Sequence, residues 1–588
     1  MDTRLILQLD QLERAGLIRI AQLDPEVEYL FRHTLVQEAA YDSLLKQDRR
    51  RLHRAVGETL ERLYPDRLDE LALVLGHHFA QAGDVERALH YLTRAGDSSA
   101  ARYANHEAIT LYSQALQIAR GADRIDLLPS LYLKRGAAME LANRYPDALR
   151  NYEELGQVAG ESGDRATVLA SLVRRATIYA HATSEHDSNH ARVLSEEALA
   201  LARDLGDRAT EASILWTQMM LEKFAGRADI GAVYGEQSLA IAREMNLREQ
   251  LAYTLHDLGN HVYLDTSQFQ RAHEVMAEAR GLWIELGNQP MLADSLSTSA
   301  LTYFLRGEFD QALAAATEAR RISEAIGNLW GQSYSRWVVG DVYLERGQID
   351  LAVTAMEECV LLGEQGGFVG AQAGIGAVLG MTYGLLGLVE RGIEQVRRAR
   401  ATAEESLPSW VAWSIAALAR LSLRAGDLAA AQAHIGAFDR IPTAFPYSIL
   451  MGRLAEAEIA LACRDARRAL TAASNLLDYL HRAEVLPFRA DALLLQARAL
   501  QMAGQEAQAR AALLDARAQA EALGSVQVKW QILLALARWE EAYGVSKQAA
   551  HLRLQARAVV RDILDGIQRP DLRAGFSALP DVRELLSQ

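Results

Sequence analysis

Histidines beside acidic residues are the first candidates for chemistry in this chain of 588 residues. A zinc protease helix needs His-Glu followed by a second histidine on the same helix face. His106-Glu107 and His273-Glu274 both lack that second histidine. These two pairs therefore give no reason to expect metalloprotease chemistry.

Two further pairs carry side chains that could bind a metal. His77 and His78 are adjacent, so on a helix they would point about 100° apart and make a poor two-ligand site. Asp257 and His261 stand four residues apart, on one face of a predicted helix. They could ligate a metal or exchange a proton, but a hydrogen-bonded surface pair is the simpler interpretation. We predict no catalytic residue and no metal site.

Nucleotide chemistry lacks its usual loop. A phosphate-binding loop needs Gly-Lys followed by Ser or Thr, and none of the five lysines follows a glycine. The stretch 367–380 contains Gly374 and Gly376, but no predicted strand precedes it, and it falls where the repeat described below places a first helix. Close helix packing explains these glycines better than phosphate binding. We expect no cofactor on this chain.

The elements that would position any site follow a repeat of 40 residues. A fixed period of this length is typical of a helical-repeat protein. Four tyrosines mark the repeat: Tyr263, Tyr303, Tyr343 and Tyr383. Small residues extend a similar spacing in both directions, at Ala108, Ala148, Ala191, Ala232, Ala272, Ala312, Ala352, Gly392, Ala431, Ala469, Ala509 and Ala549.

Each repeat is predicted to be a pair of helices. Glycines at 307, 347 and 387 would supply the positive φ of the turn, and the acidic residue three positions later would cap the second helix. A second set of glycines would end the second helices, at Gly163, Gly206, Gly287, Gly327 and Gly524. A helix pair cannot bury its apolar face alone, so pairs must stack. The predicted fold class is all-α: a tetratricopeptide-like α-solenoid, a right-handed superhelix of about 12 helix pairs with a period of about 40.

The first 65 residues have a different pattern. A helix over 3–15 is followed by two short strands, 17–20 and 27–31, joined by a turn near Asp24-Pro25. A second helix begins near Thr34, a plausible N-cap. Helix, β-hairpin and helix together indicate the end of a winged-helix-like domain. The first helix carries too few positive charges for a DNA reader, and the basic run 46–54 is interpreted as a solvated helix face.

Residues 29–61, YLFRHTLVQEAAYDSLLKQDRRRLHRAVGETLE, resemble the segment that follows the ATPase core in STAND-type regulators. Residues 70–116 also resemble that group, in its bacterial variant with a nucleotide-cyclase or LuxR-like DNA-binding domain, an AAA-like ATPase and a tetratricopeptide tail. The resemblance implies a nucleotide-sensing role for His33. A histidine that only caps the following helix is the alternative. Because the phosphate-binding loop is missing, the ATPase must lie outside these residues. We therefore expect Met1 to open a truncated chain or a separately encoded C-terminal half.

A partner of the superhelix would meet its concave surface, which the first helices line. Aromatic and arginine side chains are the usual energetic centres of such interfaces. Packing between repeats is the alternative role for each one. The repeat phase places these residues on the concave surface: Asp257, His261, Asp294, Phe304, Tyr334, Trp337, Asp341, Trp413, Arg420, Arg498 and Arg538.

The composition indicates which class of partner the protein binds and in which cellular compartment it lies. The net charge is −14, which argues against a nucleic-acid-binding surface. Cys359 and Cys463 are isolated and indicate reduced thiols in the cytoplasm. The sequence has neither a signal-peptide pattern nor an apolar run long enough to cross a membrane. We therefore expect a protein or peptide partner and no membrane association.

We predict four parts: a winged-helix-like remnant at 1–65, an irregular connector or first repeat at 66–107, the superhelix at 108–565 and a capping segment at 566–588. The leading hypothesis is a non-catalytic sensor module that regulates an ATPase or effector domain N-terminal to it. One alternative is a free-standing tetratricopeptide scaffold. A second is a winged-helix transcription regulator that binds DNA.

Overall fold

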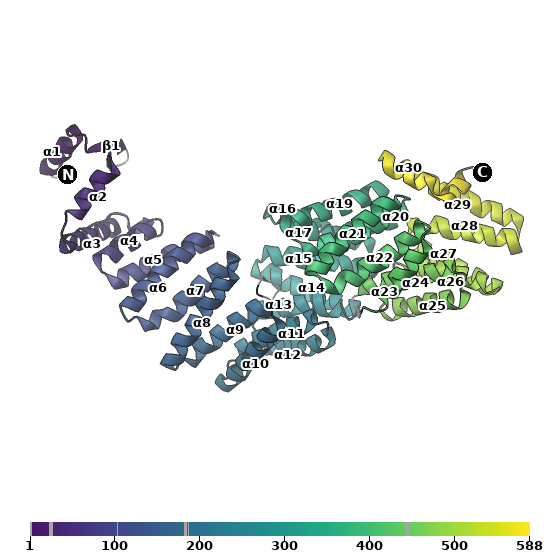
Figure 1. Ribbon diagram of the computed structural model, residues 1–588, viewed down its shortest axis with the longest axis horizontal. Coiled ribbons are helices and arrows are strands. Elements are labelled where there is room, and N and C mark those ends of the chain that lie inside the picture. The colour runs from purple at the N-terminus through teal and green to yellow at the C-terminus, as the bar shows by residue number, and fades with distance from the viewer. Residues whose placement is uncertain are drawn as a thin grey trace. The chain divides into compact units, whose positions relative to one another are not determined.

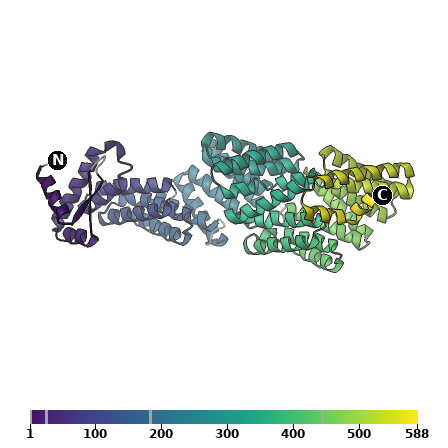
Figure 2. The same cartoon turned by 90° about the horizontal axis from the view of Figure 1, so that it is seen from above.

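The computed structural model describes residues 3–22, 27–102, 104–180, 185, 187–441 and 446–587. Contacts divide the chain into two compact units, Met1–Leu205 and Gly206–Gln588. Each unit consists almost entirely of helices packed side by side (Figure 1, Figure 2). The division lies inside the stretch 108–565, which the sequence pattern treats as one array.

The N-terminal segment has the predicted order of elements. Helix α1 (Thr3–Arg14) is followed by strands β1 (Ile18–Gln22) and β2 (Glu28–Phe31) and by helix α2 (Thr34–Asp42). The strands pair antiparallel, with Ile18 opposite Phe31. The predicted turn at Asp24-Pro25 lies outside the described residues. The predicted cap is wrong by one position: His33, not Thr34, is the N-cap of α2, and its side chain makes no capping hydrogen bond.

The rest of the first unit is a run of helices in which each packs against the next. Its core includes Phe79, Tyr112, Tyr132 and Tyr152, all at most 2% exposed. The elements are α3 (Lys46–Leu63), η1 (Pro65–Arg67), α4 (Ala72–Ala82), α5 (Val85–Ala101), α6 (Asn105–Gly121), η2 (Ile125–Leu127), α7 (Leu128–Leu141), α8 (Tyr145–Ser162), α9 (Arg165–Ala180) and α10 (Ser188–Leu205).

The second unit continues the pattern of helix pairs. Its elements are α11 (Arg208–Phe224), α12 (Ala228–Glu244), α13 (Arg248–Asp257), η3 (Leu258–Tyr263), α14 (Phe269–Leu286), α15 (Gln289–Leu305), α16 (Phe309–Ala325), α17 (Leu329–Tyr334), α18 (Val339–Glu345), α19 (Ile349–Gly366), η4 (Ala371–Ile375), α20 (Gly376–Leu385), α21 (Val389–Ser406), η5 (Pro408–Trp410), α22 (Val411–Arg424), α23 (Leu428–Phe438), α24 (Pro446–Ala462), α25 (Ala466–Arg482), α26 (Arg489–Met502), α27 (Glu506–Leu523), α28 (Val526–Tyr543), α29 (Ser546–Gly566), α30 (Pro570–Ala578) and α31 (Pro580–Ser587). From α5 to α29 the described residues form twelve helix pairs, which confirms the predicted number.

The small residues of the repeat lie where helices meet. Ala312 and Ala352 are fully buried at the starts of α16 and α19. One position is shifted by a residue: Gly231 is buried against the carbonyl oxygen of Met219, whereas Ala232 is only partly buried. A Cβ at Gly231 would lie 2.9 Å from that oxygen, so the close approach of the two helices requires glycine there.

The turn glycines adopt the predicted conformation, but the predicted caps are wrong. Gly307, Gly347 and Gly387 have φ values of 75°, 73° and 79°. The N-caps of α16 and α19 are Glu308 and Gln348, whose side chains make no capping hydrogen bond. The acidic residue three positions after the glycine is already in the first helical turn, so it can act elsewhere.

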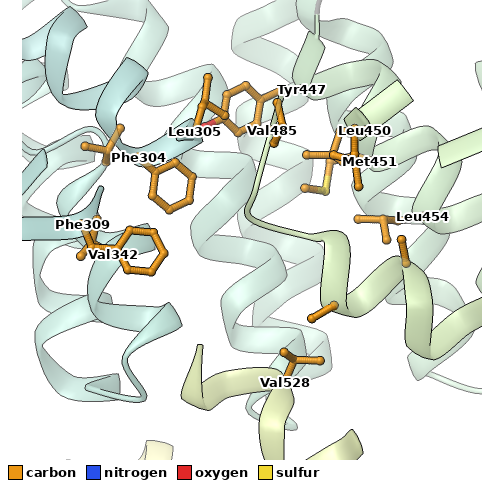
Figure 3. Close-up of a cluster of buried hydrophobic side chains, with 14 of the residues drawn as sticks. Phe304, Leu305, Phe309, Val342, Tyr447, Leu450, Met451, Leu454, Val485 and Val528 are labelled. Carbon is orange, nitrogen blue, oxygen red and sulfur yellow. The ribbon is translucent and has the colours of Figure 1, made fainter. Parts of the chain in front are cut away.

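The C-terminal half of the second unit packs against the turns of its first half. The backbone N–H of Leu486 donates to the carbonyl of Leu305 at 2.9 Å. Figure 3 shows Leu305 and Val342 in the same apolar cluster as Tyr447 and Val485. The turn glycines contact this half as well, at Leu486 and Leu523 for Gly307, at Val526 and Ile563 for Gly347, and at Gly575 for Gly387. The sequence pattern did not predict this closure.

The terminal segment packs against the last helices of the second unit. Phe576 is 4% exposed and its ring meets that of Trp530 edge-on, with centroids 6.1 Å apart. The same segment also reaches back to the middle of the unit, where Gly575 lies against the carbonyl of Leu386. The terminal segment therefore joins the two halves of the second unit.

Candidate binding surfaces

The residues predicted to line the concave surface belong to first helices of their pairs or to the turns that continue them, as the repeat phase requires. Most are not open to solvent. Phe304 and Trp413 are 1% exposed, and Tyr334 and Trp337 are 8% and 6% exposed. In this conformation these aromatic side chains form the interior of the second unit. Their binding role stays a prediction.

Asp257 and His261 lie together, as their spacing predicts. The two side chains approach to 3.8 Å between Asp257 Oδ1 and His261 Nε2, and Trp216 Nε1 donates to Asp257 Oδ2 at 2.6 Å. Asp257 is 9% exposed, whereas the His261 side chain is 32% exposed, so only the carboxylate is buried. A tryptophan from the preceding repeat thus holds the carboxylate in place.

Tyr334 connects three helices of the same interior. Its hydroxyl lies 2.9 Å from Thr298 Oγ1 and donates to Asn260 Oδ1 at 3.3 Å. Burial raises the pKa of the Tyr334 phenol, and the nearby carboxylate of Asp294 adds to the rise. Asp294 itself lies 3.5 Å from His256 Nε2. These side chains form a hydrogen-bonded layer across α13, η3, α15 and α17.

Arg420 forms a two-point ion pair with Glu458. Its Nε and Nη2 donate to the two carboxylate oxygens at 2.9 and 2.8 Å. Burial alone would raise the pKa of Glu458, but Arg420 and the neighbouring Arg424 lower it to about 2. The pair therefore remains charged in the interior. Its structural role explains Arg420 without a partner-binding or catalytic function.

Three carboxylic acids in the same interior have raised pKa values. Burial raises the pKa of Asp341 to about 7. Burial also raises the pKa of Asp491 to about 6, although Arg420 opposes the change. Glu345 has a pKa raised by burial and further by Asp491 and Asp341, and it accepts a hydrogen bond from Ser525. Of the three, only Asp341 was a predicted site residue.

The glycine-rich stretch is a packing feature, as predicted. Gly374 lies in the π-helical segment η4. A Cβ there would come within 3.0 Å of the rings of Trp337, Trp410 and Trp413. Trp413 in turn stacks on Tyr447 with ring centroids 5.1 Å apart. The absence of a side chain at 374 lets the tryptophans meet.

The last two predicted arginines lie near the closing helices. Arg538 is exposed and pairs with Asp581 and Glu584 of α31 at 2.6 and 2.5 Å. Arg498 is partly buried, and burial lowers its pKa while the carboxylate of Asp581 opposes this. Both arginines therefore face the terminal segment of their own chain.

His33 is exposed at the start of α2. Its predicted role in sensing a nucleotide stays a prediction, because that role needs a domain outside these residues. The sequence drew attention to His78 beside His77, but its contact with His53 was not predicted. His53 Nδ1 of α3 lies 2.9 Å from His78 Nδ1 of α4, and His53 Nε2 lies 3.0 Å from the hydroxyl of Tyr41. Within the part of the chain that the structure describes, no group of three ligand-type side chains could hold a metal.

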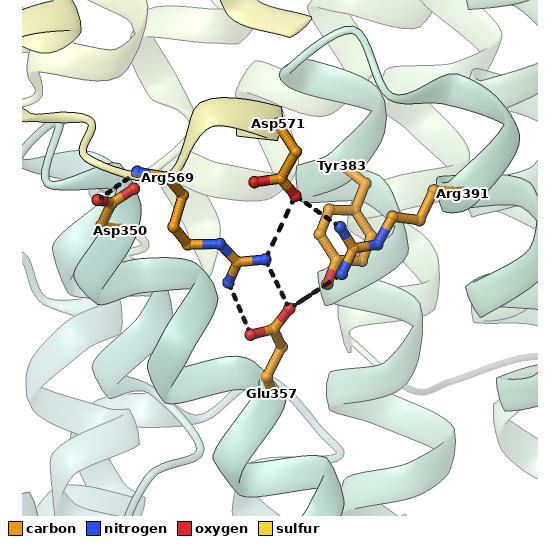
Figure 4. Close-up of polar contacts among 6 residues, drawn as sticks. All are labelled: Asp350, Glu357, Tyr383, Arg391, Arg569 and Asp571. Atoms are coloured by element: carbon orange, nitrogen blue, oxygen red, sulfur yellow. Dashed lines mark hydrogen bonds and ion pairs between the residues drawn. The ribbon is translucent and has the colours of Figure 1, made fainter. Parts of the chain in front are cut away.

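A charged cluster on the second unit was also missed. Glu357 of α19 accepts hydrogen bonds from Tyr383 at 2.6 Å, from Arg391 at 3.2 Å and from Arg569 at 2.8 Å (Figure 4). Asp571 accepts from Arg391 at 2.9 Å. Glu357 and Arg569 are 212 positions apart, so no local spacing could have predicted the cluster.

The backbone next to this cluster is held by one more carboxylate. Asp350 Oδ2 accepts from the backbone N–H of Gln568 at 2.6 Å. It also accepts from the backbone N–H of Arg569 at 3.2 Å (Figure 4). Asp350 is one of the acidic residues predicted to cap a second helix. It instead holds the segment that enters α30.

None of the helices among the described residues is long and apolar enough to cross a membrane.

No family model and no curated protein matches the sequence. The chain is similar to the solved structure of yeast Tom70, with 13% identity, covering 85% of this chain and 96% of that one, at a TM-score of 0.30. It is similar to a Rap protein complexed with competence and sporulation factor, with 11% identity, coverage of 61% and 100%, and a TM-score of 0.45. It is also similar to the APC/C hetero-tetramer Cut9-Hcn1, with 14% identity, coverage of 83% and 96%, and a TM-score of 0.33.

Proposed function

We propose that this chain is a non-catalytic module that binds other proteins in the cytoplasm. The observation that carries the proposal is the succession of twelve helix pairs from α5 to α29, which stack on one another within each unit. Such arrays offer long surfaces built from many repeats, and their usual use is recognition of a protein or peptide. The charged and aromatic clusters described above all have packing or ion-pair partners within the chain, which supports a structural role for them.

The resemblance to STAND-type ATPases suggests a regulatory form of this function. In that form a partner bound by the helical array would shift an ATPase between resting and active states through its different affinity for the two. His33 would then face the nucleotide. One structural observation supports a protein contact at this end: large apolar side chains are exposed on α1, on the hairpin and at the N-cap of α3, including Leu7 at 61%, Leu30 at 47% and Leu45 at 73%. Exposed apolar patches of this kind are typical of protein contact sites.

A free-standing scaffold is the second candidate, and the array of helix pairs supports it equally well. The two forms differ in what binds the N-terminal segment. An ATPase regulator needs an ATPase partner there, whereas a scaffold does not. DNA binding is not favoured, because α1 presents leucine and isoleucine side chains to solvent and its Arg14 is paired with Asp10 at 2.5 Å.

The test is quantitative capture of partners by the full chain in its native host. The variant Leu45→Ser with Leu52→Ser removes apolar surface from α3. Both side chains are about half exposed or more, so the fold should be retained. Loss of an ATPase from the captured set would support the regulatory form. Capture of proteins other than an ATPase by both the wild type and the variant would support the scaffold. Absence of any stoichiometric partner would contradict the proposed function.

A further inference from the structure

Two adjoining hollows lie on the first unit, where the turn after α6 meets the end of α8. Their volumes are about 360 and 170 Å³, and they share Ile125, Val158 and Ser162. Together they form a groove between η2 and the last two turns of α8. None of its lining residues belongs to the predicted concave surface.

The floor of this groove is apolar. Ile125 is 50% exposed, whereas Leu128 and Leu155 beneath it are buried. Val158 is partly buried and packs on the core of the first unit. The three-residue helix η2 holds Ile125 at the surface instead of turning it into the core, because it interrupts the path from α6 to α7. An exposed isoleucine above a buried apolar floor is suited to receive an aliphatic side chain.

The rim of the groove is acidic. Four of its charged lining residues are carboxylates and one is an arginine: Asp123, Asp126, Glu161, Asp164 and Arg120. The arginine is already paired with Glu154 at 3.2 Å, outside the groove.

Asp126 is neutralised by Arg124 at 2.8 Å, which leaves Asp123 and Glu161 as the exposed carboxylates without an ion pair among the described residues. Helices α6 and α8 both end here, at Gly121 and Ser162. A helix C-terminus carries partial negative charge, so both ends strengthen the attraction for a cation.

We propose that this groove binds a short basic segment of another protein. One aliphatic side chain of that segment would lie over Ile125 and Val158, and its lysine or arginine neighbours would face Asp123 and Glu161. The charge of the rim selects this partner, since an acidic peptide or a nucleic-acid phosphate would meet like charge. The inference deepens the proposed function and rests on it, because it names the chemistry of one partner segment.

The test uses the full chain and two fluorescein-labelled synthetic peptides of equal length. One alternates leucine with lysine, and the other has the same leucines with glutamate in place of lysine. The groove variant is Asp123→Asn with Glu161→Gln. Asparagine is chosen because residue 123 has a φ of 57°, which asparagine tolerates. The matched control is Glu196→Gln with Glu197→Gln, two exposed acids of α10 in the same unit.

Fluorescence anisotropy should show binding of the lysine peptide to the wild type and to the control. The groove variant should bind it about fivefold more weakly, from the loss of two exposed charge pairs. Ile125→Ser should weaken binding by about the same factor without lowering the melting temperature, because Ile125 is half exposed. The glutamate peptide should not bind.

Equal affinity of the groove variant and the control would overturn the proposal, as would equal affinity for the two peptides. Failure here is distinguishable from failure of the proposed function. If the groove variant still captures the same native partners as the wild type, the chain remains a protein-binding module and only the groove is excluded.

Discussion

Arg569 donates from Nη1 and Nη2 to the two carboxylate oxygens of Glu357, at 2.8 and 3.3 Å, across 212 residues of sequence. The contact ties the segment before α30 to helix α19 (Figure 4). It therefore links the last part of the second unit to its middle. Burial alone would raise the pKa of Glu357, but hydrogen bonds from Arg569 and Tyr383 lower it.

Removing this link should loosen the terminal segment. Arg569→Ala is expected to destabilise the second unit by about 1–2 kcal/mol, the range for a partly exposed hydrogen-bonded ion pair. Hydrogen exchange should quicken in α30 and α31 and in the facing turns of α19. Arg583→Ala is the matched control, since Arg583 is exposed on α31. If the two variants exchange at the same rates, the link does not hold the segment.

Gly575 should be sensitive to a single methyl group. A Cβ there would overlap the carbonyl oxygen of Leu386 and approach Leu388 Cδ2 to 3.1 Å. Gly575→Ala should therefore cost about 1–3 kcal/mol. Gly566→Ala is the control, because no other atom lies within 4 Å of the position that the alanine Cβ would occupy. Urea unfolding monitored by circular dichroism measures both, and equal midpoints would show that the two halves do not meet at Gly575.

A substitution at Ala312 tests whether the small residues of the repeat are needed for helix packing. It is fully buried at the start of α16. Ala312→Arg would force apart two helices and bury a charge, so a loss of about 2–4 kcal/mol is expected. Ala314→Arg on the exposed face of the same helix should change stability little. Thermal melts that show no loss for Ala312→Arg would contradict the assigned register.

Asp341 should give the second unit an unusual dependence on pH. Burial raises its pKa to about 7 from an ordinary value of 3.8. The folded state therefore binds more protons than the unfolded state between these values, and the free energy of unfolding should fall as the pH rises from about 4 to 7. Asp341→Asn should raise stability at pH 8 and flatten the profile. Melting temperatures across this range that are the same for variant and wild type would exclude the effect.

Local features of the fold could be predicted from the sequence. The turn glycines and the buried small residues repeat at a fixed spacing, and each depends only on neighbouring helices. The N-terminal helix, hairpin and helix also follow from local patterns. Contacts such as Leu486 with Leu305 depend on how distant repeats meet, and a repeat pattern does not contain that information.

The same limit explains the candidate site. The period placed Phe304, Trp337 and Trp413 on the concave surface, whereas the structure buries all three side chains. Their burial arises because the second half of the unit packs against the first. The groove at Ile125 could not be predicted for another reason. Its exposed isoleucine and acidic rim depend on the short helix η2, which interrupts the expected helix pair.

We propose above all that the helical array binds another protein directly. Sedimentation velocity tests this binding without nucleotide present, on the purified full chain mixed with the most abundant protein that it captures in its native host. A complex that sediments faster than either component at physiological salt is the expected result. Independent sedimentation of the two proteins would show that they do not bind.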